Sequence, residues 1–156
     1  MPNNRKDTFH LAKEFLGRIG SGTEPAEIAK LFSENMEWEI ACDIGVLPWI
    51  GQKSGRAAIT DFVSDSRTMI ERISFEVDHI LAGDDRAVII GSLASKLKRT
   101  GKIIKTDFAI VLTVTNGEIV RFQMLEDSFA VSNAARSRPG AFSERIGRQP
   151  AGCELA

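Results

Sequence analysis

Tyrosine is absent from the 156 residues of this chain, and cysteine occurs only twice. Cys42 and Cys153 are too far apart to suggest a zinc site or a disulfide framework. No stretch approaches the roughly 20 apolar residues of a membrane-spanning helix. The formal net charge of −1 lacks the basic excess typical of nucleic-acid-binding proteins. We therefore expect no metal site, no membrane association and no nucleic-acid partner.

What is present is typical of one soluble domain, with 43% apolar and 26% charged residues and enough length for a sizeable core. The N-terminal stretch MPNNRKDTFHLAKEF lacks the apolar core of a signal peptide, so we expect a cytoplasmic location. The stretch GQKSGR lacks the spacing of a phosphate-binding loop, and no catalytic triad is visible. The sequence therefore predicts no cofactor.

The stretch MEWEIACD, residues 36–43, alternates apolar and polar side chains, which predicts a strand with one face on the core. Two helical patterns precede it. The first extends from a cap at Asp7 to about Ile19, and the second has Pro25 in its first turn.

The next residues, 43–54, contain glycine and proline and predict a loop. This loop is unusually apolar, with Val46, Leu47, Trp49 and Ile50. Two interpretations stay open: the loop plugs the core, or it forms a lid over a pocket.

A third helix is expected from Ser54–Gly55 to about Arg72, where a cation suits the helix dipole. Four strand patterns joined by tight turns follow, over residues 73–81, 87–97, 103–115 and 118–127. Helices followed by antiparallel hairpins indicate an α+β fold in the order ααβαββββ, with a strongly curved sheet wrapped around helices to leave a cone-shaped apolar cavity. We expect one domain over 1–136 and a mobile tail or dimer arm over 137–156.

This order and three stretches, LFSENMEWEI, GQKSGRAAITDFV and TVTNGEIVRFQMLEDSF, resemble the SnoaL-like branch of the nuclear-transport-factor-2-like superfamily. The resemblance covers about Phe9 to Ala135. It implies a cone fold, a small apolar ligand and a homodimer formed through the open sheet face. Superfamily members include ketosteroid isomerases, limonene epoxide hydrolases and polyketide cyclases, so the fold alone does not choose a reaction.

The resemblance also implies candidate acids. Asp43 matches the general base of ketosteroid isomerases approximately, and Asp107 can match their protonated acid. Their oxyanion-hole tyrosine falls on Phe15, so that donor is missing, which typically costs about 10²–10³ in rate. Asp127 matches one acid of the limonene epoxide hydrolases. A SnoaL-type cyclase needs only one aspartate in an apolar cavity, and Asp127 or Asp107 can serve.

Each candidate has a structural alternative. Asp43 begins a loop, where a turn-forming aspartate is common, and Asp107 either faces the cavity or points to solvent beside Lys105. For Asp127 the alternative is a cap on a closing turn, and alternation with Glu126 places one of that pair inward.

His79 shares the parity of Phe75 and is either a proton-transfer group or a core residue. The expected pocket walls are aromatic: Phe15, Trp38, Trp49, Phe62 and Phe75. The sequence leaves two hypotheses, an isomerase, cyclase or hydrolase using aspartate acid–base chemistry, and a non-catalytic ligand-binding or dimeric scaffold protein.

Overall fold

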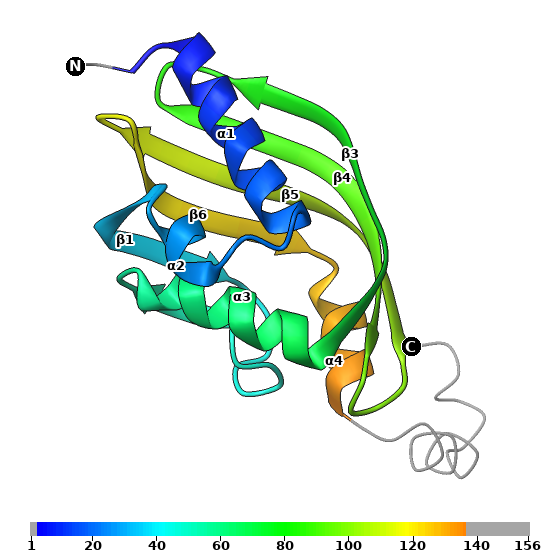
Figure 1. Ribbon diagram of the computed structural model, residues 1–156. Helices are drawn as coiled ribbons and strands as arrows, with labels where there is room; N and C mark the ends of the chain where they lie inside the picture. Colours follow the sequence, from blue (N-terminus) through cyan, green and yellow to red (C-terminus); the bar gives the residue numbers. More distant parts are fainter. Residues whose placement is uncertain (1–2, 137–156) are drawn as a thin grey trace, which may run out of the picture.

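The computed structural model describes residues 3–136 (Figure 1). The elements follow one another as α1 Arg5–Gly20, α2 Pro25–Ala29, β1 Phe32–Ile40, β2 Gly51–Ser54, α3 Ala57–Met69, β3 Ile70–Ala82, β4 Arg86–Leu97, β5 Ile103–Thr115, β6 Glu118–Glu126 and α4 Ser128–Arg136. The expected α+β class is confirmed. The expected order lacked two elements, the short strand β2 and helix α4. The tail predicted for 137–156 lies outside the described residues.

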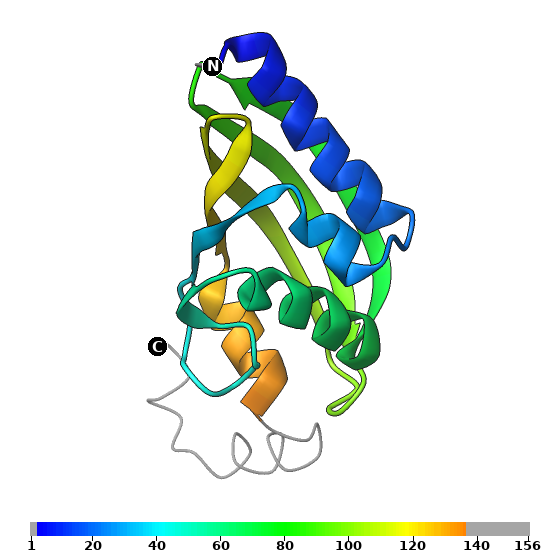
Figure 2. The same cartoon turned by 60° about the vertical axis from the view of Figure 1, so that its left-hand side comes forward.

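The six strands form one sheet in the order β2-β1-β6-β5-β4-β3. Strand β1 pairs with β6 in parallel, and the other neighbours are antiparallel. The sheet is strongly curved: α1, α2 and α3 lie on its concave side, and α4 lies at one end (Figures 1 and 2). Strand β5 is inside the sheet, as its apolar sequence predicted.

Helix α1 begins earlier than the sequence suggested. Its cap is Asn4, whose side-chain oxygen accepts a hydrogen bond of 3.0 Å from the Asp7 backbone N–H. Asp7 lies in the first turn, where a carboxylate favours the helix dipole. The expectation that Asp7 is the cap is therefore wrong by one turn. Helix α3 likewise ends at Met69, so Arg72 belongs to a strand and not to a helix end.

Strand β3 does not keep a single parity. Register shifts relative to β4 occur between Arg72 and Ser74 and between Val77 and His79. Each inserts one residue and exchanges the two faces from that point on. Gly91 lies opposite the second shift, where an added Cβ would come within 2.0 Å of the Glu76 carbonyl oxygen. A side chain at that position is therefore incompatible with this close approach of β3 and β4.

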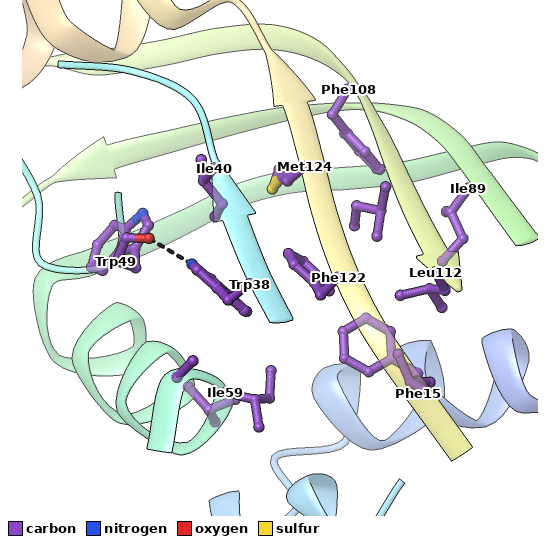
Figure 3. Close-up of a cluster of buried hydrophobic side chains, with 14 of the residues drawn as sticks. Phe15, Trp38, Ile40, Trp49, Ile59, Ile89, Phe108, Leu112, Phe122 and Met124 are labelled. Carbon is purple, nitrogen blue, oxygen red and sulfur yellow. Dashed lines mark hydrogen bonds between the residues drawn. The ribbon is translucent and has the colours of Figure 1, made fainter. Parts of the chain in front are cut away.

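The core lies between the concave face of the sheet and the helices (Figure 3). Trp38 of β1 stacks on Phe122 of β6, with ring centroids 4.4 Å apart and an interplanar angle of 8°. Phe15 of α1 meets the ring of Phe122 edge-on at 5.9 Å. These aromatic contacts join the first helix to the centre of the sheet and fix the wall on which the cavity is built.

Candidate functional site

The concave side of the sheet holds a cavity of about 400 Å³, which is within the range of small-molecule sites. Its walls come from α1, the apolar loop, α3, strands β3 to β6 and α4. The residues that line it include Phe15, Gly22, Leu47, Trp49, Phe62, Ser66, Arg67, Arg72, Phe75, Ser95, Ile104, Phe122, Met124 and Glu126.

Four of the five predicted pocket residues line this cavity: Phe15, Trp49, Phe62 and Phe75. The fifth, Trp38, does not, because only 1% of its surface is exposed and its ring lies behind the wall on Phe122. Its indole N–H donates a hydrogen bond of 2.8 Å to the Trp49 carbonyl oxygen, as Figure 3 shows. Trp38 thus positions the lining residue Trp49 and is not itself part of the cavity surface.

The apolar loop satisfies both interpretations offered for it. Leu47, Trp49 and Ile50 are buried in the core, and Leu47 and Trp49 also form part of the cavity wall. The loop therefore fills part of the core and also covers part of the cavity.

Among the residues of the described range 3–136 that line this cavity, Glu126 supplies the only carboxyl group. It follows Phe122 and Met124 on alternate positions of β6, so all three side chains face the concave side. Burial disfavours the carboxylate, and the neighbouring Asp127 repels it, and together these raise the pKa of Glu126 to about 7. Near neutral pH both its acid and its base form are populated.

Two arginines also line the cavity, at the end of α3 and the start of β3. Arg67 donates a hydrogen bond of 2.7 Å to the Thr23 carbonyl oxygen. The Arg72 guanidinium lies 5.0 Å from the centroid of the Phe75 ring. Both side chains are exposed, which places them at the opening.

Asp43 is outside the cavity. It accepts hydrogen bonds from the Ser132 hydroxyl and from the Arg136 guanidinium, both on α4. Next to it, the Cys42 thiol donates to the Ser128 carbonyl oxygen at 3.2 Å. Asp43 therefore fastens the start of the apolar loop to α4.

Asp107 and Asp127 lie together, but on the wrong face for the predicted role. Asp107 is exposed and pairs in register with Ser92 on the convex side of β5. Asp127 is exposed as well, and its carboxylate accepts a hydrogen bond of 3.0 Å from the Ala130 N–H, which caps α4. The expectation that one of them faces the cavity is therefore wrong, and the solvent and capping alternatives describe them.

His79 is also exposed. The second register shift of β3 pairs it with Ile90 on the convex side, so the parity shared with Phe75 is lost. None of the four predicted catalytic residues lines the cavity, and their catalytic roles have no support in its geometry.

The cavity contains polar groups that the sequence reasoning missed, namely Glu126, Arg67 and Arg72. Alternation along β6 already showed that one of Glu126 and Asp127 points inward, and the parity of Phe122 and Met124 selects Glu126. Arg72 had no comparable signal, because the register shift that turns its neighbours is not visible in the sequence.

Comparison with known proteins decides the family. The model of the SnoaL-like domain matches residues 13–122, which is most of the chain. The chain belongs to the SnoaL-like domain family. Among curated proteins, no sequence matches it significantly.

Solved structures show the same fold as this SnoaL-like chain. A nuclear-transport-factor-2-like protein from Burkholderia xenovorans is 21% identical with a TM-score of 0.76, over 85% of this chain and 98% of that one. A second such protein, from Burkholderia thailandensis, is 18% identical with a TM-score of 0.72, over 88% and 100%. TerC, crystallised with polyporic acid, is 19% identical with a TM-score of 0.71, over 84% and 99%. At these identities the likeness concerns the fold alone.

Within residues 3–136, no group of three histidine, cysteine, aspartate or glutamate side chains is placed to hold a metal ion. No helix in the same range combines the length and the hydropathy needed to cross a bilayer.

Proposed function

We propose that this SnoaL-like domain binds a small apolar or aromatic molecule in the cavity and transfers protons on it through Glu126, in a reaction of the isomerase or cyclase type. The observation that carries the proposal is a single carboxyl group among aromatic and aliphatic walls, with a pKa of about 7. Such a group is both a competent base and a competent acid at neutral pH.

The proposed reaction is a proton transfer in two stages. A C–H bond next to a carbonyl group breaks, its proton moves to a Glu126 carboxylate oxygen, and the electron pair stays on the ligand as an enolate. The Glu126 acid then returns the proton to another carbon or to oxygen. The ring walls exclude water and hold the ligand next to Glu126.

The fold neighbour TerC has been crystallised with polyporic acid. In the present chain the aromatic lining offers stacking surfaces for such a molecule, with Trp49 and Phe62 edge-on at 5.7 Å.

The proposal is tested with 2-tetralone, an aromatic ketone whose α-protons exchange with solvent. In D₂O, NMR spectra should show faster α-proton exchange with the wild-type protein than in buffer. Glu126→Gln should remove most of the acceleration, while Asp107→Asn, on the convex face, should keep it. Acceleration that survives Glu126→Gln and disappears in Asp107→Asn would contradict the proposal.

The second candidate function is a ligand-binding protein without catalysis. It is favoured by the absence of any further carboxyl group or histidine among the residues lining the cavity. Tight binding of 2-tetralone with no acceleration of exchange would select this candidate over the enzyme.

We also propose that a second copy of the chain covers the convex face. Large apolar side chains stand exposed there, including Leu81 (58% exposed) and Leu125 (48%). Ile90, Ala109 and Leu125 lie side by side on three adjacent strands, which makes the apolar surface continuous. Light scattering should give the mass of two chains, and Leu125→Glu should give the mass of one. A wild-type protein that stays monomeric at high concentration would contradict the dimer.

A further inference from the structure

We infer that the ligand of this cavity is an aromatic acid, whose anionic group binds Arg72 and Arg67 at the opening while its apolar body extends inward toward Glu126. The inference rests on the proposed function, because it names the chemical class that the same cavity accepts. It depends on the charges of the opening, which that proposal does not use.

Arg67 and Arg72 place two positive charges at the opening of the cavity, and neither is in an ion pair within the described residues. The ion pairs formed within residues 3–136 use other arginines, for example Arg18 with Glu14 and Arg121 with Glu39. None of them includes Arg67 or Arg72. Two cations without an ion-pair partner at the mouth of an apolar cavity attract an anionic ligand and stabilise it once it is bound.

The Arg72 side chain is held in place by an aromatic ring. Its guanidinium lies 5.0 Å from the centroid of the Phe75 ring, and Phe75 stacks on Phe108 with ring centroids 4.9 Å apart. A guanidinium packed on a ring keeps the N–H donors along its edge available for a planar carboxylate. The ring thus orients Arg72 without using its hydrogen-bonding capacity.

Arg67 is fixed in a different way. One of its guanidinium nitrogens donates to the Thr23 carbonyl oxygen at 2.7 Å, and the nearby Gly22 lines the same opening. A guanidinium carries five N–H donors, so this contact leaves others available. The two arginines therefore approach the opening from different elements, α3 and β3.

Arg72 and the Glu126 carboxyl group are also separated along the sheet. Arg72 pairs with Ser95, and Ser95 pairs with Ile104 of β5. Glu126 pairs with Phe108 of the same strand. Four residues along a strand correspond to about 13 Å, so the two charged groups lie at separate ends of the lining.

This separation agrees with the causes of the Glu126 pKa. Burial and the charge of Asp127 raise that pKa, and neither arginine contributes a lowering effect. Neither arginine therefore interacts electrostatically with Glu126 strongly enough to lower its pKa. A ligand with an anionic end and an apolar body matches both ends at once.

The experiment uses two dyes with the same aromatic frame. 1-Anilinonaphthalene-8-sulfonate carries an anionic group, and N-phenyl-1-naphthylamine does not. In fluorescence titrations at low salt, Arg72→Met should weaken binding of the sulfonate about tenfold, the size expected for one charge-assisted contact. It should change binding of the neutral dye less than twofold. Arg72→Gln serves as a second variant, and added salt should weaken only the sulfonate.

Two further variants control this result. Arg86→Met removes an exposed cation outside the cavity and should affect neither dye. Ser66→Trp fills the cavity and should weaken both, which separates cavity binding from adsorption on the convex face. Equal effects of Arg72→Met on the two dyes, or no effect on either, would overturn the inference while leaving the proposed function intact. If Ser66→Trp weakened neither dye, ligand binding in the cavity and the proposed function would fail together.

Discussion

The concave and convex faces of the sheet are built from alternate residues of the same strands, yet they carry different chemistry. On β6 the concave residues are Phe122, Met124 and Glu126. Phe122 belongs to the core, Met124 to the cavity wall, and Glu126 is the cavity acid. The convex residues are Arg121, Gln123 and Leu125. Arg121 forms exposed ion pairs, Gln123 donates a side-chain hydrogen bond, and Leu125 belongs to the exposed apolar surface.

The comparison shows why the type of residue was a poor guide to the site. Every aspartate that looked catalytic lies on the convex face or at the rim, where a carboxylate remains hydrated. The acid that enters the cavity is a glutamate, and its surroundings give it the unusual pKa. The face that a side chain occupies matters more here than the identity of the side chain.

The largest expected difference between the faces concerns stability. Phe122→Ala removes the ring that Trp38 and Phe15 contact, and it should lower the free energy of unfolding by about 3–5 kcal/mol. Arg121→Ala, one residue earlier, should cost less than about 1 kcal/mol, because its ion pairs are exposed. Urea denaturation measures both. Similar losses for the two variants would contradict the assignment of faces.

The next effect is the pH dependence that Glu126 contributes. Its pKa in the folded state is about 7, above the ordinary value of 4.5, so the folded state binds its proton more tightly than the unfolded state does. This contribution to stability is fully present below pH 4.5 and is lost as the pH rises to about 7. It amounts to at most about 3.4 kcal/mol, at about 1.36 kcal/mol per pKa unit.

Denaturation between pH 4.5 and 7.5 tests this sign. The stability of Glu126→Gln relative to the wild-type protein should increase as the pH rises through this window, because the glutamine has no proton to lose. A constant difference between the two proteins across the window would refute the shifted pKa.

A smaller effect is expected for Asp43, outside the cavity, where the apolar loop meets α4. Asp43→Asn removes the charge that holds Ser132 and Arg136 of α4. The free energy of unfolding should fall by about 1 kcal/mol, since the contacts are partly exposed. Exchange of 2-tetralone protons per folded molecule should stay unchanged. Loss of exchange without loss of stability would instead restore Asp43 as a catalytic residue.

The smallest effect is expected on the convex face itself. Asp107→Asn alters an exposed side chain, so the free energy of unfolding should change by no more than about 0.5 kcal/mol. The affinity for N-phenyl-1-naphthylamine should stay the same. Titrations of that dye with Asp107→Asn and the wild-type protein side by side check this, and a clear loss of affinity would place Asp107 at the site.

The fold was largely predictable because its determinants are local. The alternation in β1 is set by neighbouring residues. So is the Asn116–Gly117 turn, where both residues have positive φ. The expected pocket walls were placed well for a similar reason, since large aromatic residues on the apolar faces of the elements must meet inside a cone. Trp38 is not a wall residue because Phe122 and Phe62, which do line the cavity, pack against its ring.

The polar part of the site was not predictable in the same way. The side on which Arg72 lies depends on the first register shift in β3, and the side of His79 on the second. Both shifts depend on the fit between β3 and β4, which the sequence pattern does not show. Glu126 is the exception, because the alternation of Phe122 and Met124 along β6 selects it over its neighbour Asp127 as the inward residue. Asp127 instead caps helix α4, an element that the sequence pattern did not predict.

The most direct test of the account is an NMR titration of the glutamate side-chain carboxyl carbons. We expect the signal of one glutamate to titrate near pH 7. This signal should be missing from the spectrum of Glu126→Gln, and it should shift when N-phenyl-1-naphthylamine is added. If every glutamate titrated near the ordinary value of about 4.5, or if the high-titrating signal survived Glu126→Gln, the central claim of an acid held in the cone would be contradicted.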